Sequence, residues 1–285
     1  MRPPYVTDEL INDFIDRAFQ EDLGDGDHST LASIPADAEK SAYLLMKESG
    51  VIAGMELAPI IFHKLDPEMV LEPFVKDGDR VAKGDVILRI KGKVRAILSG
   101  ERLLLNCMQR MSGIATKTAY LNSLIEGTGT QLLDTRKTTP NMRMLEKWAV
   151  LIGGGVNHRY GLYDMVMLKD NHIDFAGGIQ QAVQATRHYL AEKGLNLKIE
   201  VETRNLNEVQ QALDAGGVDR IMLDNMSNAE MKQAVELIAK RSETEASGGI
   251  TEETIRSVAE TGVDFISVGA LTHSIKSLDI SLKAE

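Results

Sequence analysis

From residue 130 onward, short apolar segments alternate with amphipathic ones. The apolar segments are rich in Val, Ile, Leu and Met, and they span residues 130–135, 164–170, 198–203, 219–225 and 264–270. The intervening segments repeat their apolar positions at helical spacing, over residues 178–194, 205–217, 228–241 and 251–262. This alternation predicts a series of parallel βα units.

Two of these units echo each other. The stretches VQQALDAGGVDRIMLDN (209–225) and IRSVAETGVDFISVGA (255–270) share the order helix, Gly, Val-Asp and apolar strand. Units this short are typical of a barrel with little decoration. No GxGxxG turn follows any of the strands, which disfavours an open doubly wound sheet. We therefore expect a barrel or partial barrel in this half of the chain.

The first part of the chain has a mixed pattern. Helices are predicted over residues 7–24 and 57–66, and a long helix over 99–126. Two strands are predicted over residues 42–55 and a series of short β-strands over 74–98. Ser99 is the expected N-cap of the long helix, which is weakly interrupted at Gly113. The short β-strands turn at Asp77-Gly78 and Lys83-Gly84.

The segment 74–98 is also similar to half of a biotinyl or lipoyl carrier barrel. Such a module needs an exposed Lys at a hairpin tip, usually flanked by Met, Asp or Ala. That setting is found for none of the four lysines of the segment, which are Lys76, Lys83, Lys91 and Lys93. An ordinary β structure is favoured over a carrier module.

Composition narrows the class of protein. The chain has 285 residues, 43% of them hydrophobic, which supports a full-sized core in one large or two smaller domains. Its net charge of −10 argues against nonspecific binding to nucleic acid or to anionic lipid. The start has no apolar stretch of signal-peptide length and no later segment is of transmembrane length, so a cytoplasmic protein is expected. The single Cys107 is interpreted as a buried thiol.

Chemistry is expected where the strands end, because functional groups of βα barrels gather at the carboxyl face. The strand ends carry Asp134, Arg136, Lys137, Lys169, Asp170, Glu202, Asp224, Asn225, Ser247, Gly248, Gly249 and Gly269. Glu200 and Glu202 share one face of their strand, so at least one carboxylate should point into the barrel mouth. Lys169 directly follows four apolar residues, which indicates a functional role because buried lysines are rare unless paired.

Cations cluster in an otherwise acidic chain. One half of the predicted barrel carries Arg136, Lys137, Arg143, His158, Arg159 and Lys169. Arg binds carboxylates in a fork-like way, whereas Lys and glycine-rich backbone suit phosphates, so the cluster indicates a polyanionic ligand. Glu202 and Asp224 could hold Mg²⁺ or ribose hydroxyls. The six His are scattered and the lone Cys has no partner at ligand spacing, so no zinc site is predicted.

Several motifs, taken together and in order, resemble those of the quinolinate phosphoribosyltransferase family. They are EDLGDGDHST, SGERLLLNCMQRMSGIAT, DTRKTTPNMR, GGGVNHRYGLYDMVMLKDNHI, EVET, IMLDN, EASGGI and SVGALTHS. The resemblance implies an α/β fold with an N-terminal open α/β sandwich (residues 1–112) and a C-terminal incomplete (β/α) barrel (residues 113–285). It allows roughly the last 12 residues to pack back on the N-terminal domain.

The resemblance also implies the reaction, which is phosphoribosyl transfer to quinolinate with decarboxylation, and a homodimer with shared active sites. Quinolinate would be bound by Arg136, His158, Arg159 and Lys169, with Arg102 from the neighbouring subunit. The residues implied for 5-phosphoribosyl 1-pyrophosphate and Mg²⁺ are Lys137, Glu202, Asp224, Ser247, Gly248, Gly249, Gly269 and His273, with Thr138 as an additional donor. Of these groups, Lys137, Lys169, Glu202 and Asp224 are the expected catalytic residues, and Glu202 and Asp224 the expected metal ligands.

Two alternative enzymes remain open at this point. One is a Schiff-base lyase or aldolase with Lys169 as the amine. The other is a related phosphoribosyltransferase that acts on nicotinate without decarboxylation. Arg143 is interpreted as a cation at a helix start. The turn DAGGVD (214–219) has an additional residue compared with the family pattern, which affects no predicted site residue.

Overall fold

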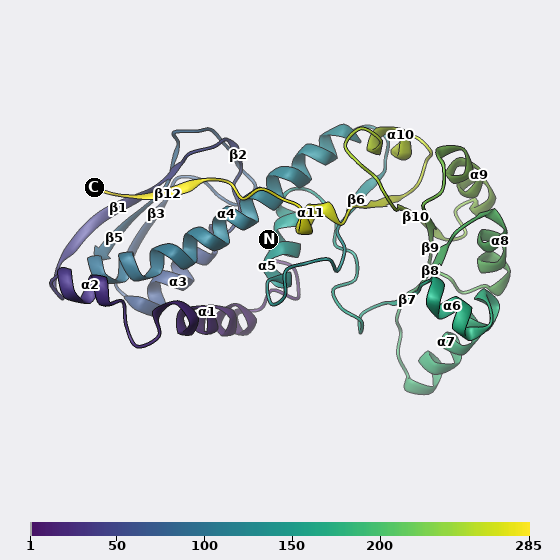
Figure 1. Ribbon diagram of the computed structural model, residues 1–285, viewed down its shortest axis with the longest axis horizontal. Helices are drawn as coiled ribbons and strands as arrows, with labels where there is room; N and C mark the ends of the chain where they lie inside the picture. Colours follow the sequence, from purple (N-terminus) through teal and green to yellow (C-terminus); the bar gives the residue numbers. More distant parts are fainter. Residues whose placement is uncertain (1) are drawn as a thin grey trace. The chain divides into compact units, whose positions relative to one another are not determined.

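The computed structural model describes residues 2–285, which form two compact units. Unit 1 consists of the residues up to Ala119, Thr138–Gly154 and Ala270–Glu285. Unit 2 consists of Tyr120–Lys137 and Gly155–Gly269. Figure 1 traces the chain through both units.

Unit 1 is built on a four-stranded antiparallel sheet in the order β12-β1-β5-β3. Its strands are β1 (Glu39–Met46), β3 (Val70–Pro73), β5 (Val86–Lys93) and β12 (Ile280–Ala284), and a separate pair joins β2 (Gly50–Val51) to β4 (Arg80–Val81). Along β1 the buried side chains alternate with partly buried ones, as expected for a sheet whose two faces differ in burial. Pairing of β12 with β1 brings the C-terminal residues into this sheet.

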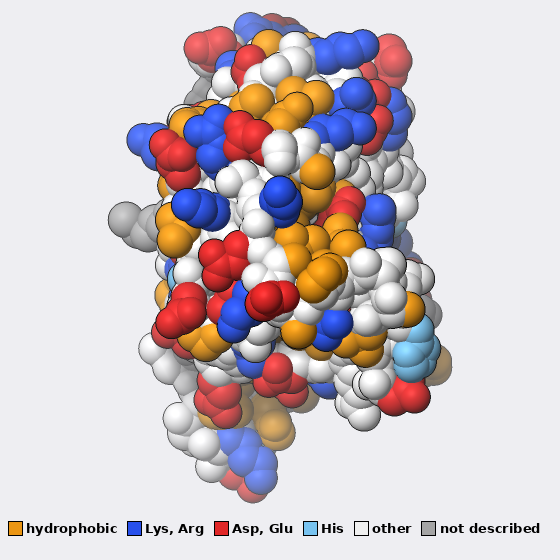
Figure 2. All heavy atoms as spheres, turned by 90° about the vertical axis from the view of Figure 1, so that its left-hand side faces the viewer, with side chains coloured by type: hydrophobic (Ala, Val, Ile, Leu, Met, Phe, Trp, Pro, Cys, Tyr) orange, Lys and Arg blue, Asp and Glu red, His pale blue; other side chains and the backbone are white. Residues whose placement is uncertain are grey.

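The helices of unit 1 are α1 (Asp8–Leu23), α2 (His28–Ser33), α3 (Leu57–Leu65), α5 (Arg143–Ile152), α11 (Ala270–His273) and most of α4 (Val94–Leu124). The predicted turns at Gly78 and Gly84 are confirmed, and both glycines have positive φ. Figure 2 shows basic and acidic side chains interspersed over one side of the molecule, with hydrophobic ones gathered between them.

Helix α4 corrects the expected start of the long helix. It begins at Val94 rather than near Ser99. Residues 94–98, which the sequence predicts as the end of the short β-strands, form the first turn of the helix instead. The Ser99 hydroxyl therefore caps nothing and contacts Asp27 Oδ2 at 3.3 Å. Gly113 does not interrupt the helix. A side chain there would overlap the backbone of Lys276, so Gly113 permits close packing.

Unit 2 contains a six-stranded, all-parallel sheet in the order β6-β11-β10-β9-β8-β7. The strands are β6 (Gln131–Leu133), β7 (Val166–Leu168), β8 (Ile199–Thr203), β9 (Arg220–Asp224), β10 (Glu243–Ser247) and β11 (Phe265–Ser267). Within the described residues no ladder joins β6 to β7, so the sheet forms an incomplete barrel, as predicted.

The helices of unit 2 follow one another along one side of this sheet (Figure 1). They are α6 (Asp170–Ala176), α7 (Ile179–Lys193), α8 (Leu206–Ala215), α9 (Asn228–Ile238) and α10 (Ile255–Ala259). Strand β10 has no counterpart among the five apolar segments, because its sequence ETEAS is almost entirely polar. Thr244 and Glu245 are nevertheless buried, so this strand forms through pairing and ion contacts.

Two further predictions concern the single cysteine and membrane-spanning helices. Cys107 is 2% exposed, and burial raises the pKa of its thiol to about 12, which confirms an inert core thiol. Among residues 2–285, no helix combines the length and the apolar character needed to cross a membrane.

Candidate active site

Three side chains meet where β7, β8 and β9 end. Lys169 directly follows β7, Glu202 lies near the end of β8, and Asp224 closes β9. Lys169 Nζ lies 3.9 Å from Glu202 Oε2. Burial and the nearby Asp224 both raise the pKa of Glu202. We call these three residues the strand-end layer.

The strand-end layer has an excess of negative charge. Two neighbouring carboxylates repel each other, and this repulsion favours the binding of a cation or of hydroxyl donors between them. The only cation that approaches Glu202 in this layer, Lys169, is half exposed and stays at the edge of ion-pair distance. The layer is therefore open to a ligand with positive or hydroxyl groups.

A glycine-rich segment lies at the end of β10. Gly248 and Gly249 have φ of 95° and 60°. A side chain at Gly248 would overlap the amide of Asn225, whose backbone N–H donates to Ser247 O at 2.9 Å. The positive φ favours glycine at both positions, and the backbone of such a loop suits phosphate oxygens. Gly269 lies two residues after the end of the neighbouring strand, β11.

Two arginines follow β6 and precede β7. The pKa of Arg159 is lowered by its burial and by the charge of Arg136. Arg159 also donates to Met165 O at 3.3 Å. An anion bound near these two arginines would relieve the unfavourable interaction of their charges.

His158 lies beside these arginines but faces inward. Its ring is 4% exposed, with Nε2 at 2.9 Å from Glu200 Oε2 and at 3.3 Å from Glu245 Oε2. Glu245 Oε2 also accepts from Arg220 Nη1 at 3.0 Å. Both glutamates are 0% exposed. We call these four residues, His158, Glu200, Arg220 and Glu245, the buried charge layer.

The His158 backbone and ring are held on their other sides as well. The His158 N–H donates to Asp134 Oδ1 at 2.8 Å, and Nδ1 accepts from the Arg159 N–H at 2.7 Å. Asp134 is fully buried and also accepts from Asn157 Nδ2 at 2.7 Å. The segment that carries His158 and Arg159 has no regular secondary structure, so these contacts fix its position.

The groups of the buried charge layer titrate together. Burial opposes a charge on His158, but Glu200 and Glu245 outweigh it and raise the pKa of His158 to about 9. Burial and Glu245 raise the pKa of Glu200. Both shifts describe one proton retained between His158 and Glu200. An imidazolium has no acceptor nitrogen, so the contact of the Arg159 N–H with Nδ1 belongs to the neutral ring with its proton on Nε2, and the retained proton then lies on Glu200, whose pKa is raised.

His158, Glu200 and Glu245 each offer a ligand atom, and these atoms lie within 4.8 Å of one another. Ligand spacing along the sequence could not reveal this cluster, because the three residues lie on separate elements. Arg220 already places a positive charge 3.0 Å from Glu245 Oε2. The cluster is therefore explained as a buried ion network rather than a metal site.

Of the remaining predicted site residues, Lys137 belongs to unit 2 and the others to unit 1. Arg102 is exposed on α4, and the Thr138 hydroxyl accepts from Arg143 Nε at 3.0 Å. Arg143 is the first residue of α5, which confirms its interpretation as a helix-start cation. His273 ends α11 and contacts Ser274 Oγ at 2.7 Å. Lys137 is exposed at the end of unit 2's first segment. A common site for these residues and the strand-end layer stays a prediction.

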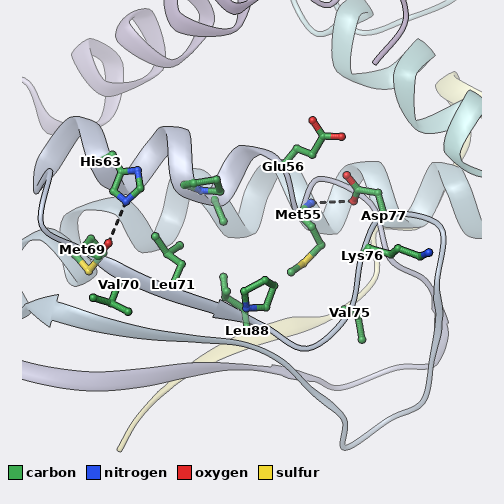
Figure 3. Close-up of a pocket in the computed structure, with 13 residues that line it drawn as sticks. Met55, Glu56, His63, Met69, Val70, Leu71, Val75, Lys76, Asp77 and Leu88 are labelled. Atoms are coloured by element: carbon green, nitrogen blue, oxygen red, sulfur yellow. Dashed lines mark hydrogen bonds between the residues drawn. The ribbon is translucent and has the colours of Figure 1, made fainter. Parts of the chain in front are cut away.

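Unit 1 also contains a cavity of about 710 Å³ between α3 and the strands β3 and β5 (Figure 3). Its lining is mostly apolar and includes Met55, Leu71 and Leu88. Asp77 Oδ1 accepts from the Met55 N–H at 2.9 Å at one end. None of the predicted site residues lines this cavity.

Two residues of the buried charge layer have no sequence pattern that marks them. Glu245 and Arg220 have no apolar spacing or motif that marks them as functional. A charged residue on the inward face of a strand is the one local feature that could mark them. Alternation identifies that face only where the strand is recognisable from its sequence. Strand β9 is apolar and recognisable, whereas the polar sequence of β10 conceals the strand that carries Glu245.

Comparison with known proteins covers nearly the whole chain. The family model described as quinolinate phosphoribosyl transferase, C-terminal domain, matches residues 114–283, and the N-terminal domain model matches residues 27–112. A chloroplastic nicotinate-nucleotide pyrophosphorylase [carboxylating] of Arabidopsis thaliana is 49% identical over 300 residues, which cover 100% of this chain and 86% of that protein. A probable nicotinate-nucleotide pyrophosphorylase [carboxylating] of Bacillus subtilis is 43% identical, covering 96% and 92%.

Solved structures of similar proteins have the same fold as this chain. The crystal structure of NadC from Streptococcus pyogenes superposes with a TM-score of 0.92 at 42% sequence identity, covering 98% of this chain and 99% of that one. A structure from Francisella tularensis, described as a nicotinate-nucleotide pyrophosphorylase, also has a TM-score of 0.92, at 38% identity and 98% coverage of both chains. With both domain models matched, the chain belongs to the quinolinate phosphoribosyltransferase family.

Proposed function

We propose that this protein transfers the phosphoribosyl group of 5-phosphoribosyl 1-pyrophosphate to quinolinate and releases pyrophosphate and CO₂. The product is nicotinate mononucleotide, an intermediate of NAD biosynthesis. The similarity to proteins named quinolinate phosphoribosyltransferase [decarboxylating], over the full length of this chain, carries the proposal. The geometry of unit 2 supports the roles of individual residues.

Quinolinate carries two carboxylates, which the converging cations would bind. Arg136 and Arg159 lie close enough for their charges to oppose each other, and a dianion relieves that opposition. Lys169, at the neighbouring strand end, would bind the same substrate. The family motif also assigns His158 to this group, but in this structure both of its ring nitrogens contact protein groups, Nε2 beside Glu200 and Glu245 and Nδ1 with the Arg159 N–H.

The phosphoribosyl donor would lie across the strand-end layer and the glycine-rich segment. The backbone at Ser247, Gly248, Gly249 and Gly269, with Lys137 and His273, would hold its phosphates. Glu202 and Asp224 fit Mg²⁺, because Asp224 raises the pKa of Glu202 and Mg²⁺ prefers carboxylate oxygens together with phosphate oxygens. A bound Mg²⁺ would neutralise charge on the departing pyrophosphate.

The charges of these residues also suit the transition state. As pyrophosphate leaves, the ribose C1 becomes positive, and the carboxylates of Glu202 and Asp224 would stabilise it. Held by the arginines, the pyridine nitrogen would attack C1 from the opposite face. The ring nitrogen then carries a positive charge, which stabilises the electron pair left on the adjacent ring carbon as its carboxylate departs as CO₂. A proton from solvent then forms the C–H bond at that carbon.

The reaction separates this proposal from the nicotinate alternative. Purified protein with 5-phosphoribosyl 1-pyrophosphate, Mg²⁺ and quinolinate is expected to release pyrophosphate and CO₂ in equal amounts. Nicotinate in place of quinolinate is expected to give neither. Pyrophosphate release with nicotinate but not with quinolinate would contradict the proposal. A cytoplasmic location stays a prediction from the sequence.

The homodimer with shared sites belongs to the same proposal, supported by the exposure of Arg102 on α4. The variants Arg102→Ala and Glu202→Gln should each be nearly inactive. After the two are mixed under conditions that exchange subunits, one site of each mixed dimer is intact, and activity should return to about a quarter of the parent value. No recovery, despite exchange shown by mass spectrometry, would contradict shared sites.

A further inference from the structure

The interior of the unit 2 barrel is charged where such interiors are usually filled by branched apolar side chains. Glu200, Arg220 and Glu243 pair along neighbouring strands at one level of the sheet, and Glu245 lies one pleat nearer the strand ends. The proposed reaction uses neither Glu245 nor Arg220. Charged side chains are costly to bury, so a network of this kind needs an explanation.

Contacts run from this interior to one of the predicted substrate-binding arginines. Arg220 is held by Glu243 Oε2, at 3.1 Å from Nε and 3.0 Å from Nη2, and its guanidinium lies 4.2 Å from the centre of the Phe265 ring. Arg220 in turn holds Glu245 at 3.0 Å. Glu245 faces His158 Nε2 at 3.3 Å.

The last link is the His158 ring itself. With Nε2 at 2.9 Å from Glu200 Oε2 and at 3.3 Å from Glu245 Oε2, the ring presents Nδ1 to the Arg159 backbone N–H, 2.7 Å away. Rotation of the ring by half a turn would remove both contacts. The orientation of the ring therefore decides whether the backbone of Arg159 is held in place.

We propose that Glu245, supported by Arg220, is a positioning residue for Arg159: it orients the His158 ring so that Nδ1 holds the Arg159 backbone beside Arg136. This inference rests on the proposed function for the identity of the anion that Arg159 binds. Arg136 and Arg159 repel each other, so Arg159 needs a fixed backbone to stay in place before the substrate arrives. The role of Glu245 is thus to pre-organise the quinolinate site.

The test is Glu245→Gln, with Glu243→Gln as its matched control. Both substitutions remove a carboxylate charge next to the same Arg220, but only Glu245 contacts His158. We expect Glu245→Gln to raise the KM for quinolinate by at least about fivefold, with kcat and the KM for 5-phosphoribosyl 1-pyrophosphate within about twofold of the parent. Glu243→Gln should leave the KM for quinolinate within about twofold.

A purely structural role gives a different result. In that case both variants would lose kcat in proportion to the fraction of folded protein, with an unchanged KM for quinolinate, and the inference would be overturned. Equal increases of this KM in both variants would also overturn it. Parent turnover with quinolinate tests the proposed function separately, because the inference concerns only the difference between the variants.

A second measurement requires neither a variant nor turnover. Proton–nitrogen correlation spectra of ¹⁵N-histidine-labelled parent protein, assigned with His158→Gln, should show His158 with a proton on Nε2 and none on Nδ1. That pattern supports the inward orientation of Nε2. A proton on Nδ1 would exclude the Arg159 N–H contact and would overturn the inference.

Discussion

Two carboxylates on one strand illustrate two different uses of charge. Glu200 and Glu202 lie two residues apart on β8 and on the same face. Glu200 is 0% exposed and lies 2.9 Å from His158 Nε2, in the buried charge layer. The Glu202 side chain is 13% exposed and has Lys169 at 3.9 Å, in the strand-end layer. One pleat of β8 thus separates the two carboxylates.

The layers differ in how their charges are compensated. In the buried charge layer, Arg220 reaches both Glu243 and Glu245 at 3.0 Å. In the strand-end layer, Asp224 makes the charge of Glu202 less favourable, and the compensating group would be a ligand. The paired charges of the buried layer hold the fold, whereas the uncompensated carboxylates of the strand-end layer are available for chemistry.

The largest effect is expected from Arg220→Met. The substitution leaves Glu245 buried without its cation, so the free energy of unfolding should fall by about 3–5 kcal/mol. Chemical denaturation measures this loss. As a control, Arg256→Met removes an exposed ion pair with Glu260 and should cost less than about 1 kcal/mol. Equal losses in the two variants would mean that the buried charge layer does not stabilise the fold.

The second effect concerns activity. Glu202→Gln should lower kcat by about 100-fold or more, because it removes a charge aimed at the positive ribose centre. Its melting temperature should stay at or above that of the parent, since the substitution relieves repulsion with Asp224. Steady-state kinetics and thermal unfolding check both statements. Turnover within a few-fold of the parent would show that Glu202 does not have the proposed role.

The smallest effect is expected at the opposite end of the strands. Asp264 precedes β11 and accepts from Lys240 Nζ at 2.6 Å and from the Thr244 N–H at 2.9 Å. Burial opposes its charge, but these donors outweigh burial and lower the pKa of Asp264. Its contribution to stability is therefore complete above the unfolded pKa of about 3.9 and is lost as pH falls through the lower folded pKa.

Asp264→Asn should accordingly lower the melting temperature by about 2–4 °C at pH 7. Below about pH 3 the difference should shrink, because the parent then protonates as well. kcat should stay within about twofold of the parent, since this end of a βα barrel serves stability. Thermal scans across pH, with a kinetic assay at pH 7, provide the measurement. A difference that grows toward low pH would contradict the assigned direction of the pKa shift.

Much of unit 2 can be predicted because its signals are local. Apolar segments followed by amphipathic ones indicate parallel βα units, and strand ends in such units share one edge. The pattern alone assigns Lys169, Glu202 and Asp224 to that edge, and the fold brings them together. The start of α4 is harder to predict, because a short apolar run such as residues 94–98 fits a strand and a helix equally well.

The sequence by itself determined the βα pattern, the positions of the strand ends and the family to which the chain belongs. Only the tertiary structure decided that Glu200 is paired in the interior while Glu202 stays open, and that the His158 ring faces Glu245. Alternation along a strand specifies the face of a side chain but not its partners. Those partners lie on other strands and loops, and their distances are set by how the sheet curves and which neighbours it brings together.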